Sequence, residues 1–454
     1  MNKDQPIKNQ VTPAVQNNSW RVARLLARRQ IQHSSIWLNI LIIAIMVITF
    51  LNLVATTGIL VGLFEGSVKA NREQFTGDVF ISELPTEGSI ENTPRLLSTI
   101  QSLDGVKEFT TRYASGASVE ANYQNRRDFT EDGNSVGANV VGINPEVEDQ
   151  VTHLADYLVD GEYLESGESG YILIGNTLLQ EYSNFSDIFV PLQNTTPGSK
   201  VRITVTNSAS IMDGEGMDPA APTSDGRDSF GSRTLEFTLK GVVDSKVGEN
   251  SSRVFMTEAD WRRLTGRPNT NVNEVAIIVN DGVDPSTIKE SLVKSGFNRY
   301  AEIEIYTEAI PSFLNDIKIT FGLLGNLIGS IGIFVASITT FIVIYINALT
   351  RRKYIGILKG IGITGSSIER AYLFQAMFYA LLGIGIASLL IYAVFIPFVN
   401  ANPIDFPFAD GILVAEPVGT LIRGIIMFIV TAIAGFIPAW LIVKQNTLDS
   451  ILGR

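Results

Sequence analysis

One short basic stretch decides how this chain is organised: Arg351-Arg352-Lys353-Tyr354-Ile355-Gly356-Ile357-Leu358-Lys359-Gly360-Ile361-Gly362-Ile363-Thr364. It lies between two long uncharged runs, and four of its side chains are cationic. Short loops on the cytoplasmic side of a membrane carry an excess of Lys and Arg. The stretch therefore predicts a turn of the chain at the cytoplasmic membrane surface.

The same stretch has the pattern of an amphipathic helix. Tyr354, Leu358 and Ile361 stand at positions i, i+4 and i+7, which places them on one face of a helix. A basic amphipathic helix at a membrane surface either rests on anionic lipid or docks into the groove of a partner. The residues alone leave both alternatives open.

Four uncharged runs are long enough to cross a bilayer. We expect transmembrane helices over residues 36–64, 319–349, 373–398 and 422–443, the last free of charge from Gly424 onward. As single helices, the first two uncharged runs would be about 43 Å and 48 Å long, which exceeds the roughly 30 Å hydrocarbon core. The first run is also too long for a signal peptide and has no small-residue cleavage pattern.

The region between the first two spans, residues 65–312, reads as a mixed α/β domain. Six strand-like runs support this reading: 78–82, 106–113, 137–143, 200–206, 233–243 and 273–280. Helices are signalled between them by Thr93-Pro94, Thr257 and Asp284-Pro285, which are typical of helix starts. Residues 207–232 are rich in Gly, Asp, Ser and Pro, and we expect a long surface loop there.

Charge is segregated along the chain. Residues 64–312 hold 39 Asp and Glu against 20 Lys and Arg, whereas the remainder holds 7 against 15. This pattern argues for two compartments rather than for nucleic-acid binding. It places residues 65–312 and the acidic loop 399–420 outside the membrane, and the segment 350–372 and the tail 444–454 in the cytoplasm. Residues 1–18 are expected to be disordered, followed by a basic cytoplasmic helix over 19–35 with Ser19 as its cap.

The composition argues against several classes of chemistry. The chain has no Cys and two His, so we expect no disulfide and no metal or cofactor site in it. The spans offer no ionisable group for a proton or ion path, and there is no G-x-x-x-x-G-K-[ST] phosphate-binding loop. His153 lies in an acidic stretch and is expected at the surface, so a membrane-anchored enzyme is a remote alternative.

The second span carries a stripe of four glycines, Gly322, Gly325, Gly329 and Gly332. Small residues at this spacing let two helices approach closely. We expect the stripe to pack within the chain or against a second copy of it.

The whole layout, with one span, a large inserted domain and three further spans, resembles the MacB/FtsX-like permease family of ABC transporters. The segment Arg351–Gly362 is similar to that family's R-R-x-E-I-G-I-L-K-A-L-G segment, with Tyr354 in place of Glu and Gly360 in place of Ala. Three weaker matches are Val141–Glu146 with Leu158–Leu164, Ile437–Trp440, and Leu448–Leu452. The length of the inserted domain is nearest to that of MacB-like and lipoprotein-releasing permeases.

The resemblance implies a permease subunit in a bacterial inner membrane, with both termini in the cytoplasm. It implies that a separate cytoplasmic P-loop ATPase holds ATP and magnesium and docks on a coupling helix. The contact residues implied are Arg351, Arg352, Lys353, Tyr354, Ile355, Gly356, Leu358, Lys359 and Ile361, of which Ile355, Leu358 and Ile361 would be the apolar anchors. Tyr354 removes a carboxylate that could pair with the ATPase.

The remaining partners implied are a second permease copy, membrane lipid, and a cargo or adaptor protein outside the membrane. The chain itself would not be an enzyme. It would transmit ATP-driven motion to the outer domain, which would act on a lipoprotein, peptide or drug cargo. The alternative is a signal transmitter that controls cell-wall enzymes outside the membrane.

Overall fold

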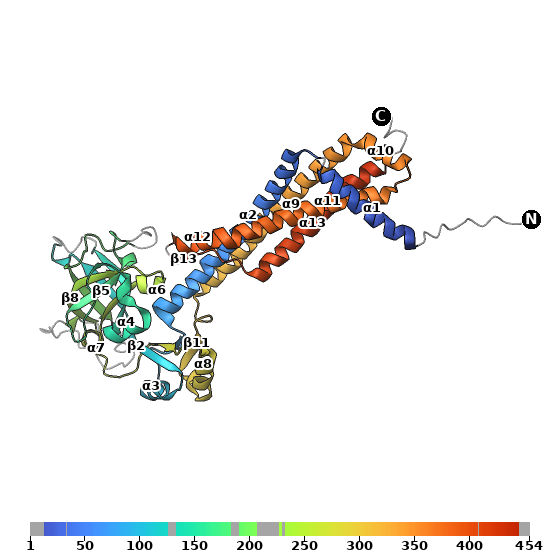
Figure 1. Cartoon of the computed structure of the whole chain (residues 1–454). Coiled ribbons are helices and arrows are strands. Elements are labelled where there is room, and N and C mark those ends of the chain that lie inside the picture. The colour runs from blue at the N-terminus through green and yellow to red at the C-terminus, as the bar shows by residue number, and fades with distance from the viewer. Residues whose placement is uncertain are drawn as a thin grey trace, which may run out of the picture. The chain divides into compact units, whose positions relative to one another are not determined.

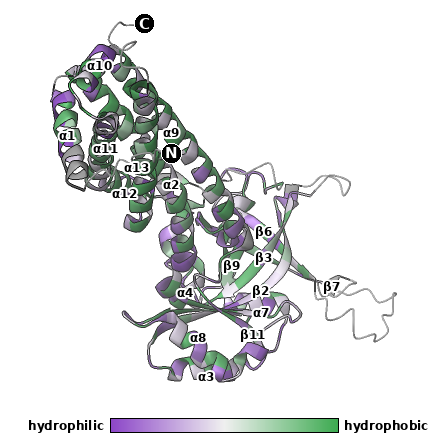
Figure 2. Cartoon of the chain, turned by 90° about the vertical axis from the view of Figure 1, so that its right-hand side faces the viewer, coloured by the Kyte–Doolittle hydropathy of each residue, from purple (hydrophilic) through white to green (hydrophobic). Residues whose placement is uncertain are grey.

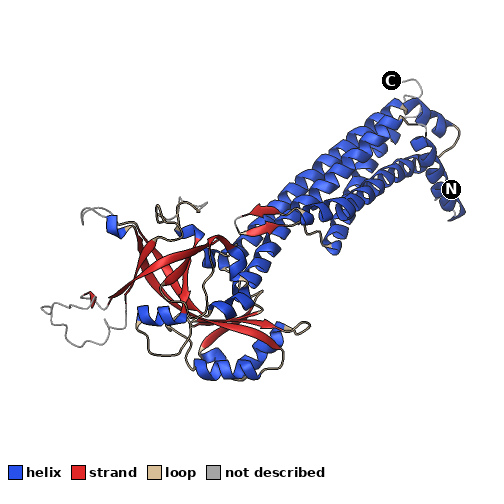
Figure 3. Ribbon diagram, turned by 60° about the vertical axis from the view of Figure 1, so that its left-hand side comes forward, coloured by secondary structure: helices blue, strands red, loops and turns tan. Residues whose placement is uncertain are grey.

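The computed structural model describes residues 13–32, 34–125, 133–182, 190–206, 227–228, 232–406 and 408–444. Four helices in these ranges are apolar and long enough to cross a membrane, and a mixed α/β domain is inserted between the first and the second (Figure 3). The expected fold class is therefore confirmed. The chain divides into a helical unit (1–64, 316–405 and 410–454) and an α/β unit (65–315 and 406–409).

The helical unit is built from long helices that are hydrophobic over most of their length (Figure 2). Its elements are α1 (Pro13–Gln32), α2 (Ile36–Asn71), α9 (Ser312–Thr350), α10 (Arg352–Gly360), α11 (Gly365–Leu390), η6 (Ile391–Phe395), α12 (Ile396–Ala401) and α13 (Pro417–Val443). Two short strands, β12 (Ile404–Phe406) and β13 (Ala409–Gly411), pair in the segment between α12 and α13. α2 continues without a break beyond Phe64 into the α/β unit.

Several helix boundaries differ from those expected. α1 begins at Pro13, so Ser19 lies inside the helix and is not its cap. The segment 350–372 is not one helix, because α10 ends at Gly360 and α11 begins at Gly365, ahead of the expected start of the third span. α13 likewise begins at Pro417, ahead of the expected 422.

Gly362 explains where α10 stops. Its φ of +95° is a backbone conformation that favours glycine. The N–H of Gly362 donates to the carbonyl of Lys359, and the N–H of Ile363 donates to that of Leu358, both at 3.0 Å. This pair of bonds is a Schellman motif, which satisfies the last carbonyls of the helix and turns the chain toward α11.

The α/β unit is organised on one large sheet with the strand order β11-β1-β10-β2-β3-β9-β5-β8-β4. Figure 1 labels four of these strands, β2, β5, β8 and β11. Its strands are β1 (Val79–Glu83), β2 (Val106–Ala121), β3 (Ser135–Ile143), β4 (Leu158–Gly161), β5 (Tyr171–Gly175), β6 (Lys200–Thr206), β7 (Arg227–Asp228), β8 (Ser232–Val243), β9 (Arg253–Thr257), β10 (Glu274–Val279) and β11 (Ala301–Ile305). The long strand β2 joins the two halves of the sheet, since it pairs with β10 at its start and with β3 and β6 farther on.

Four helices cover this sheet: α3 (Thr93–Ser102), α4 (Pro145–Thr152), α7 (Glu258–Thr265) and α8 (Pro285–Lys294). The Asp284 carboxylate accepts a hydrogen bond from the N–H of Ser286, and the Thr257 hydroxyl accepts one from that of Asp260, so both expected caps are confirmed. The expected cap at Thr93 is wrong, because Asn92 precedes the helix and the Thr93 hydroxyl donates to the carbonyl of Ile90.

All six strand-like runs of the sequence contain strands, but β4, β5, β7, β9 and β11 were not expected. β9 is buried at every position and runs parallel to β3, so it lacks the alternation that marks a half-exposed strand. Of the expected loop 207–232, only residues 227–228 and 232 are among the described residues.

Candidate functional site

The inner face of α10 is fixed to the helical unit by apolar contacts. Ile355 is 3% exposed and belongs to a buried cluster with residues of α9, α11 and α13, among them Ile344, Tyr372 and Val443. Leu358 packs against the same cluster, and the Lys359 ammonium donates a hydrogen bond to the carbonyl of Val443. α10 is thereby held by the ends of three membrane helices.

The outer face of α10 is apolar and exposed. Tyr354 is 71% exposed, Ile357 53% and Ile361 71%. These residues stand at i, i+3 and i+7, so they share one side of the helix and of the turn that follows it. Lys353 is also exposed beside them. We call Lys353, Tyr354, Ile357 and Ile361 the outer face of α10.

The structure divides the expected contact residues between the two faces. Ile355 packs inward, so it does not serve as an exposed anchor, and Leu358 is only partly accessible. Gly356 is buried, and Arg351, Arg352 and Lys359 are half-buried. Ile361 does point outward. Sequence reasoning missed Ile357, although its spacing of three from Tyr354 fits the helical period as well as Leu358 does.

The glycine stripe of α9 packs mainly against α2 of the same chain. A Cβ atom on Gly325 would lie 3.0 Å from Cγ2 of Thr57, and one on Gly332 would lie 3.6 Å from Cγ2 of Thr49. A Cβ atom on Gly329 would collide with Leu53 Cδ1, whereas one on Gly322 would have no neighbour within 4 Å. Three of the four glycines therefore bring α9 and α2 close together, as expected for packing within the chain.

A second pair of glycines, on α2 itself, receives the segment before α13. A Cβ atom on Gly58 would lie 2.7 Å from the carbonyl oxygen of Val414, and one on Gly62 would collide with that of Ile412. The N–H of Val414 donates to the carbonyl of Gly58 at 3.2 Å. This G-x-x-x-G pair was visible in the sequence but was not singled out. It ties α2 to the chain between α12 and α13.

The continuation of α2 ends in the α/β unit in a π-helical turn, Arg72–Thr76, that is held by polar contacts. The side-chain oxygen of Gln74 (Oε1) accepts hydrogen bonds from the Ser245 hydroxyl at 2.8 Å and from the N–H of Lys246 at 2.9 Å. The backbone carbonyl of Gln74 accepts one from the Asn250 amide at 2.6 Å. The Asn71 amide donates to the carbonyl of Ala309, just before α9, at 2.9 Å.

Phe75 in this turn is contacted by two arginines. The guanidinium carbon of Arg112 is 4.8 Å from the centre of the Phe75 ring, and that of Arg253 is 4.7 Å from it. A fully buried Arg112 also donates to the Phe75 carbonyl and pairs with Glu148 at 2.7 Å. Glu274 pairs with both arginines, at 3.3 Å and 2.6 Å. We call Phe75, Arg112, Glu148, Arg253 and Glu274 the root cluster.

The two arginines of the root cluster favour the ionised form of Glu274. Burial alone would raise the pKa of its carboxyl group, because the charged form loses hydration. The positive charges of Arg253 and Arg112 and their hydrogen bonds outweigh burial and lower the pKa below its ordinary value. Glu274 is therefore ionised at neutral pH and keeps two buried cations paired.

The described residues offer no metal centre, since no group of three or more His, Asp or Glu side chains is placed to hold an ion. His153 is exposed at the end of α4 with φ +53°, as expected of a surface histidine. The charged residues of the long helices lie near helix ends, such as Glu369 and Arg370 in α11.

Comparison with known proteins gives a family match for part of the chain and similarity to distant solved structures. Residues 326–447 match the family of the FtsX-like permease C-terminal domain. A search of curated proteins gives no match. The periplasmic region of MacB from Actinobacillus actinomycetemcomitans is 14% identical with a TM-score of 0.33, and the match covers 52% of this chain and 92% of that one. The extracellular domain of the noncanonic ABC-type transporter YknZ from Gram-positive bacteria is 11% identical with a TM-score of 0.29, over 50% and 98% of the two chains.

Proposed function

Residues 326–447 form an FtsX-like permease domain, and on this premise we propose that the chain is the membrane subunit of an ABC transporter driven by a separate cytoplasmic ATPase. The ATPase would hold ATP and magnesium. Two permease chains, identical or related, would work as a pair, with their termini in the cytoplasm and the α/β unit outside. The work would be done on cargo outside the membrane, in the lipoprotein, peptide or drug export class.

The outer face of α10 carries this proposal. It combines an apolar centre of Tyr354, Ile357 and Ile361 with a basic flank at Lys353, and it lies on a helix whose inner face is already occupied. An amphipathic helix of this kind fits a groove on a partner protein. Because Ile355 and Leu358 fasten α10 to three membrane helices, a push on its outer face would move those helices together.

A continuous path for such a push is supported by the two long helices. α2 runs from Ile36 to Asn71 across the boundary between the two units, and α9 packs on it through the glycine stripe. The root cluster and Gln74 then hold the end of α2 in the α/β unit. Motion imposed on the helices would therefore reach the α/β unit through covalent chain and directional bonds.

The absence of charge at the centre of the described spans supports work outside the membrane. Transporters that move ions or polar solutes through the bilayer place ionisable groups or broken helices near its centre. Here the middle of each of the four spans carries no Asp, Glu, Lys or Arg, and the π-helical turn η6 and Pro438 of α13 lie toward the ends of their spans. We therefore assign the cargo to the outer unit rather than to a path between the helices.

The direct test is co-purification of the ATPase with the tagged chain from its own host, analysed by mass spectrometry. We expect a P-loop ATPase to accompany the wild-type chain and to be lost from the Ile357→Asp variant, because a carboxylate on the outer face cannot be buried in an apolar groove. Leu358→Asp is a poorer test, since Leu358 packs against the helical unit and its loss would disturb the fold.

Ser366→Asp is the matched control. Ser366 is exposed in the first turn of α11, so the variant adds the same charge near α10 without touching its outer face. It should retain the ATPase. Equal recovery of ATPase with all three chains would refute the docking assignment, as would recovery of no ATPase with the wild type.

A further inference from the structure

An apolar groove with a basic rim lies on the side of the helical unit where α1 meets α11 and α13. It measures about 660 Å³, which is within the roughly 300–1,000 Å³ range of small-molecule sites. Its rim carries Arg24 and Arg28 of α1, and its floor is formed by Phe374, Phe378, Leu381 and Phe428. None of these residues belongs to the outer face of α10.

α1 is held in place beside the groove by aromatic contacts. Trp20 meets Phe374 edge-on, with 5.7 Å between the ring centres, and the Arg370 guanidinium lies 4.6 Å from the centre of the Trp20 ring. Ala23 and Ala27 are buried between the helices. The floor stays accessible, since Phe378 is 41% exposed and Leu381 63%. The groove is therefore a built feature that opens to the side of the bundle.

The rim is strongly cationic. Arg24 and Arg28 are exposed and stand one helical turn apart, so their guanidinium groups can approach one ligand. Over α1, α10 and the first two turns of α11, all of which the structure describes, the sequence has eight Lys and Arg against a single carboxylate, Glu369. A second copy seated on the groove would have to bury these arginines without an adequate supply of acids, which is costly.

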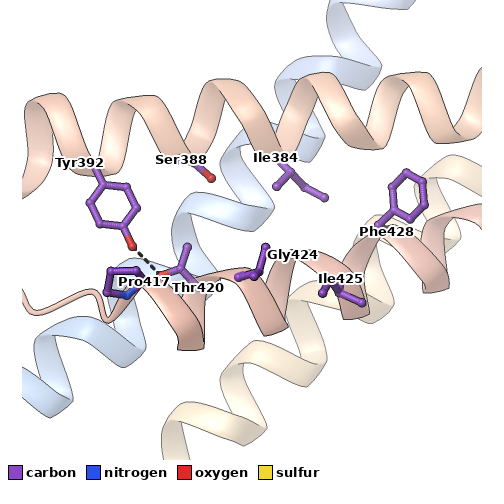
Figure 4. A pocket seen from close by; sticks show the side chains of 9 residues that line it. Ile384, Ser388, Tyr392, Pro417, Thr420, Gly424, Ile425 and Phe428 are labelled. Atoms are coloured by element: carbon purple, nitrogen blue, oxygen red, sulfur yellow. Dashed lines mark hydrogen bonds between the residues drawn. The ribbon is translucent and has the colours of Figure 1, made fainter.

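A second groove continues the first along α11 and α13. It is lined by Ile384, Ser388, Tyr392, Gly424 and Phe428, and Phe428 belongs to both grooves (Figure 4). At its far end the Tyr392 hydroxyl and the Thr420 hydroxyl are 3.1 Å apart. From Phe374 in α11 to Tyr392 in η6 the helical chain rises about 27 Å, close to the roughly 30 Å of a hydrocarbon core. The basic rim thus marks one membrane surface and the apolar floor runs inward from it.

We propose that the groove between α1, α11 and α13 binds an anionic phospholipid of the cytoplasmic leaflet. Arg24 and Arg28 would hold the phosphate of a headgroup that carries no compensating cation, by charge-assisted hydrogen bonds, and an acyl chain would lie along Phe374, Phe378 and Leu381. The inference uses the orientation proposed above, with α1 in the cytoplasm, but it does not require an ATPase. A lipid there would fasten α1 to the bundle next to the start of α11.

The test is native mass spectrometry of the full-length chain in mild detergent, titrated with phosphatidylglycerol or with phosphatidylcholine of the same acyl chains. Because each arginine near an anionic lipid contributes about 1 kcal/mol, which is about fivefold in affinity, we expect Arg24→Gln with Arg28→Gln to weaken phosphatidylglycerol binding about 30-fold. Its affinity should then equal that of phosphatidylcholine. Leu381→Trp, which fills the floor and keeps the arginines, should weaken both lipids.

Arg21→Gln with Arg29→Gln is the matched control, since it removes two charges from the same helix and neither residue lines the groove. It should change phosphatidylglycerol affinity less than threefold. Equal losses in both double variants would show diffuse surface attraction and overturn the site, as would equal binding of the two lipids by the wild type. Because the chain has no Cys, Phe378→Cys tests a second copy cleanly, and disulfide-linked dimers through it would also overturn the lipid assignment.

Discussion

The proposed path runs from α10 to the end of α2, and these two elements are held in place by different kinds of interaction. α10 is held to the helical unit mostly by apolar contacts through Ile355 and Leu358, which are non-directional and permit small shifts. The end of α2 is held in the α/β unit by the root cluster, where buried charges and hydrogen bonds fix both distance and angle. We infer that the attachment of α10 is flexible enough to adjust when a partner binds. The attachment of α2 is rigid, so that it transmits motion to the α/β unit with little loss.

The largest effect should come from breaking the rigid end. Arg112→Leu leaves Glu148 buried without its cation, and removing one partner of a buried pair costs about 3–5 kcal/mol. Thermal unfolding of the purified chain, followed through the buried Trp261, should show a markedly lower midpoint for the α/β unit. The control Arg202→Leu breaks a half-exposed pair with Glu120 and should cost about 0–1 kcal/mol. Similar midpoints for the two variants would contradict a structural role for the root cluster.

A smaller effect is expected where α9 packs on α2. Gly329→Ala places a Cβ atom against Leu53, and overpacking of this kind costs about 1–3 kcal/mol. Gly322→Ala has open space and should be neutral or gain up to about 1 kcal/mol, because Ala favours the helix. Detergent unfolding curves of the two variants would test this, and the opposite order of stabilities would show that the stripe packs elsewhere.

Substitutions on the two faces of α10 should have different effects. Those on the inner face should lower stability, and those on the outer face should weaken ATPase binding. Leu358→Ala should lower stability by about 1–2 kcal/mol, less than a fully buried Leu, since Leu358 is partly accessible. Ile357→Ala should leave stability nearly unchanged and weaken ATPase binding instead. Parallel measurements of unfolding and of ATPase recovery would reveal the split. Equal effects of the two variants on both readouts would mean that the faces are not distinct.

The smallest expected effect is the pH dependence of stability that Glu274 causes, which is small near neutral pH. Its pKa is lowered in the folded chain, so its ionised form stabilises the fold above the ordinary Glu pKa of about 4.3. That contribution is lost as the pH falls through the lowered folded pKa. The urea midpoint reported by Trp261 should therefore be flat from pH 7 to about 5 and decline below about 4. In Glu274→Gln the decline over this range should be shallower, and an identical slope would exclude Glu274 as its source.

The sequence predicted the membrane architecture because four charge-free runs and the segregation of charge leave few alternatives. It also predicted that the glycine stripe is a close-packing surface, within the chain or against a second copy, and that α10 is amphipathic. It could not separate the inner from the outer face of α10, because Ile355, Ile357 and Leu358 are all apolar and only tertiary packing decides which of them is buried.

The root cluster was beyond sequence reasoning for a different reason. Arg112, Glu148 and Glu274 look like ordinary surface charges on strands and a helix, and nothing local marks them as buried. They meet only because β2, β10 and α4 come together in the folded unit. The pair Gly58 and Gly62 is the opposite case, since its spacing was a visible signal for close packing.

In the proposed mechanism, motion started at α10 reaches the α/β unit. The most direct test places a spin label at Gln101→Cys, an exposed position of α3 in an otherwise cysteine-free chain, and measures distances between paired copies in the assembled complex with its ATPase. We predict that ATP shifts this distance, and that Ile357→Asp abolishes the shift while Ser366→Asp preserves it. An unchanged distance on ATP binding, with the ATPase attached and active, would show that motion at α10 does not reach the α/β unit.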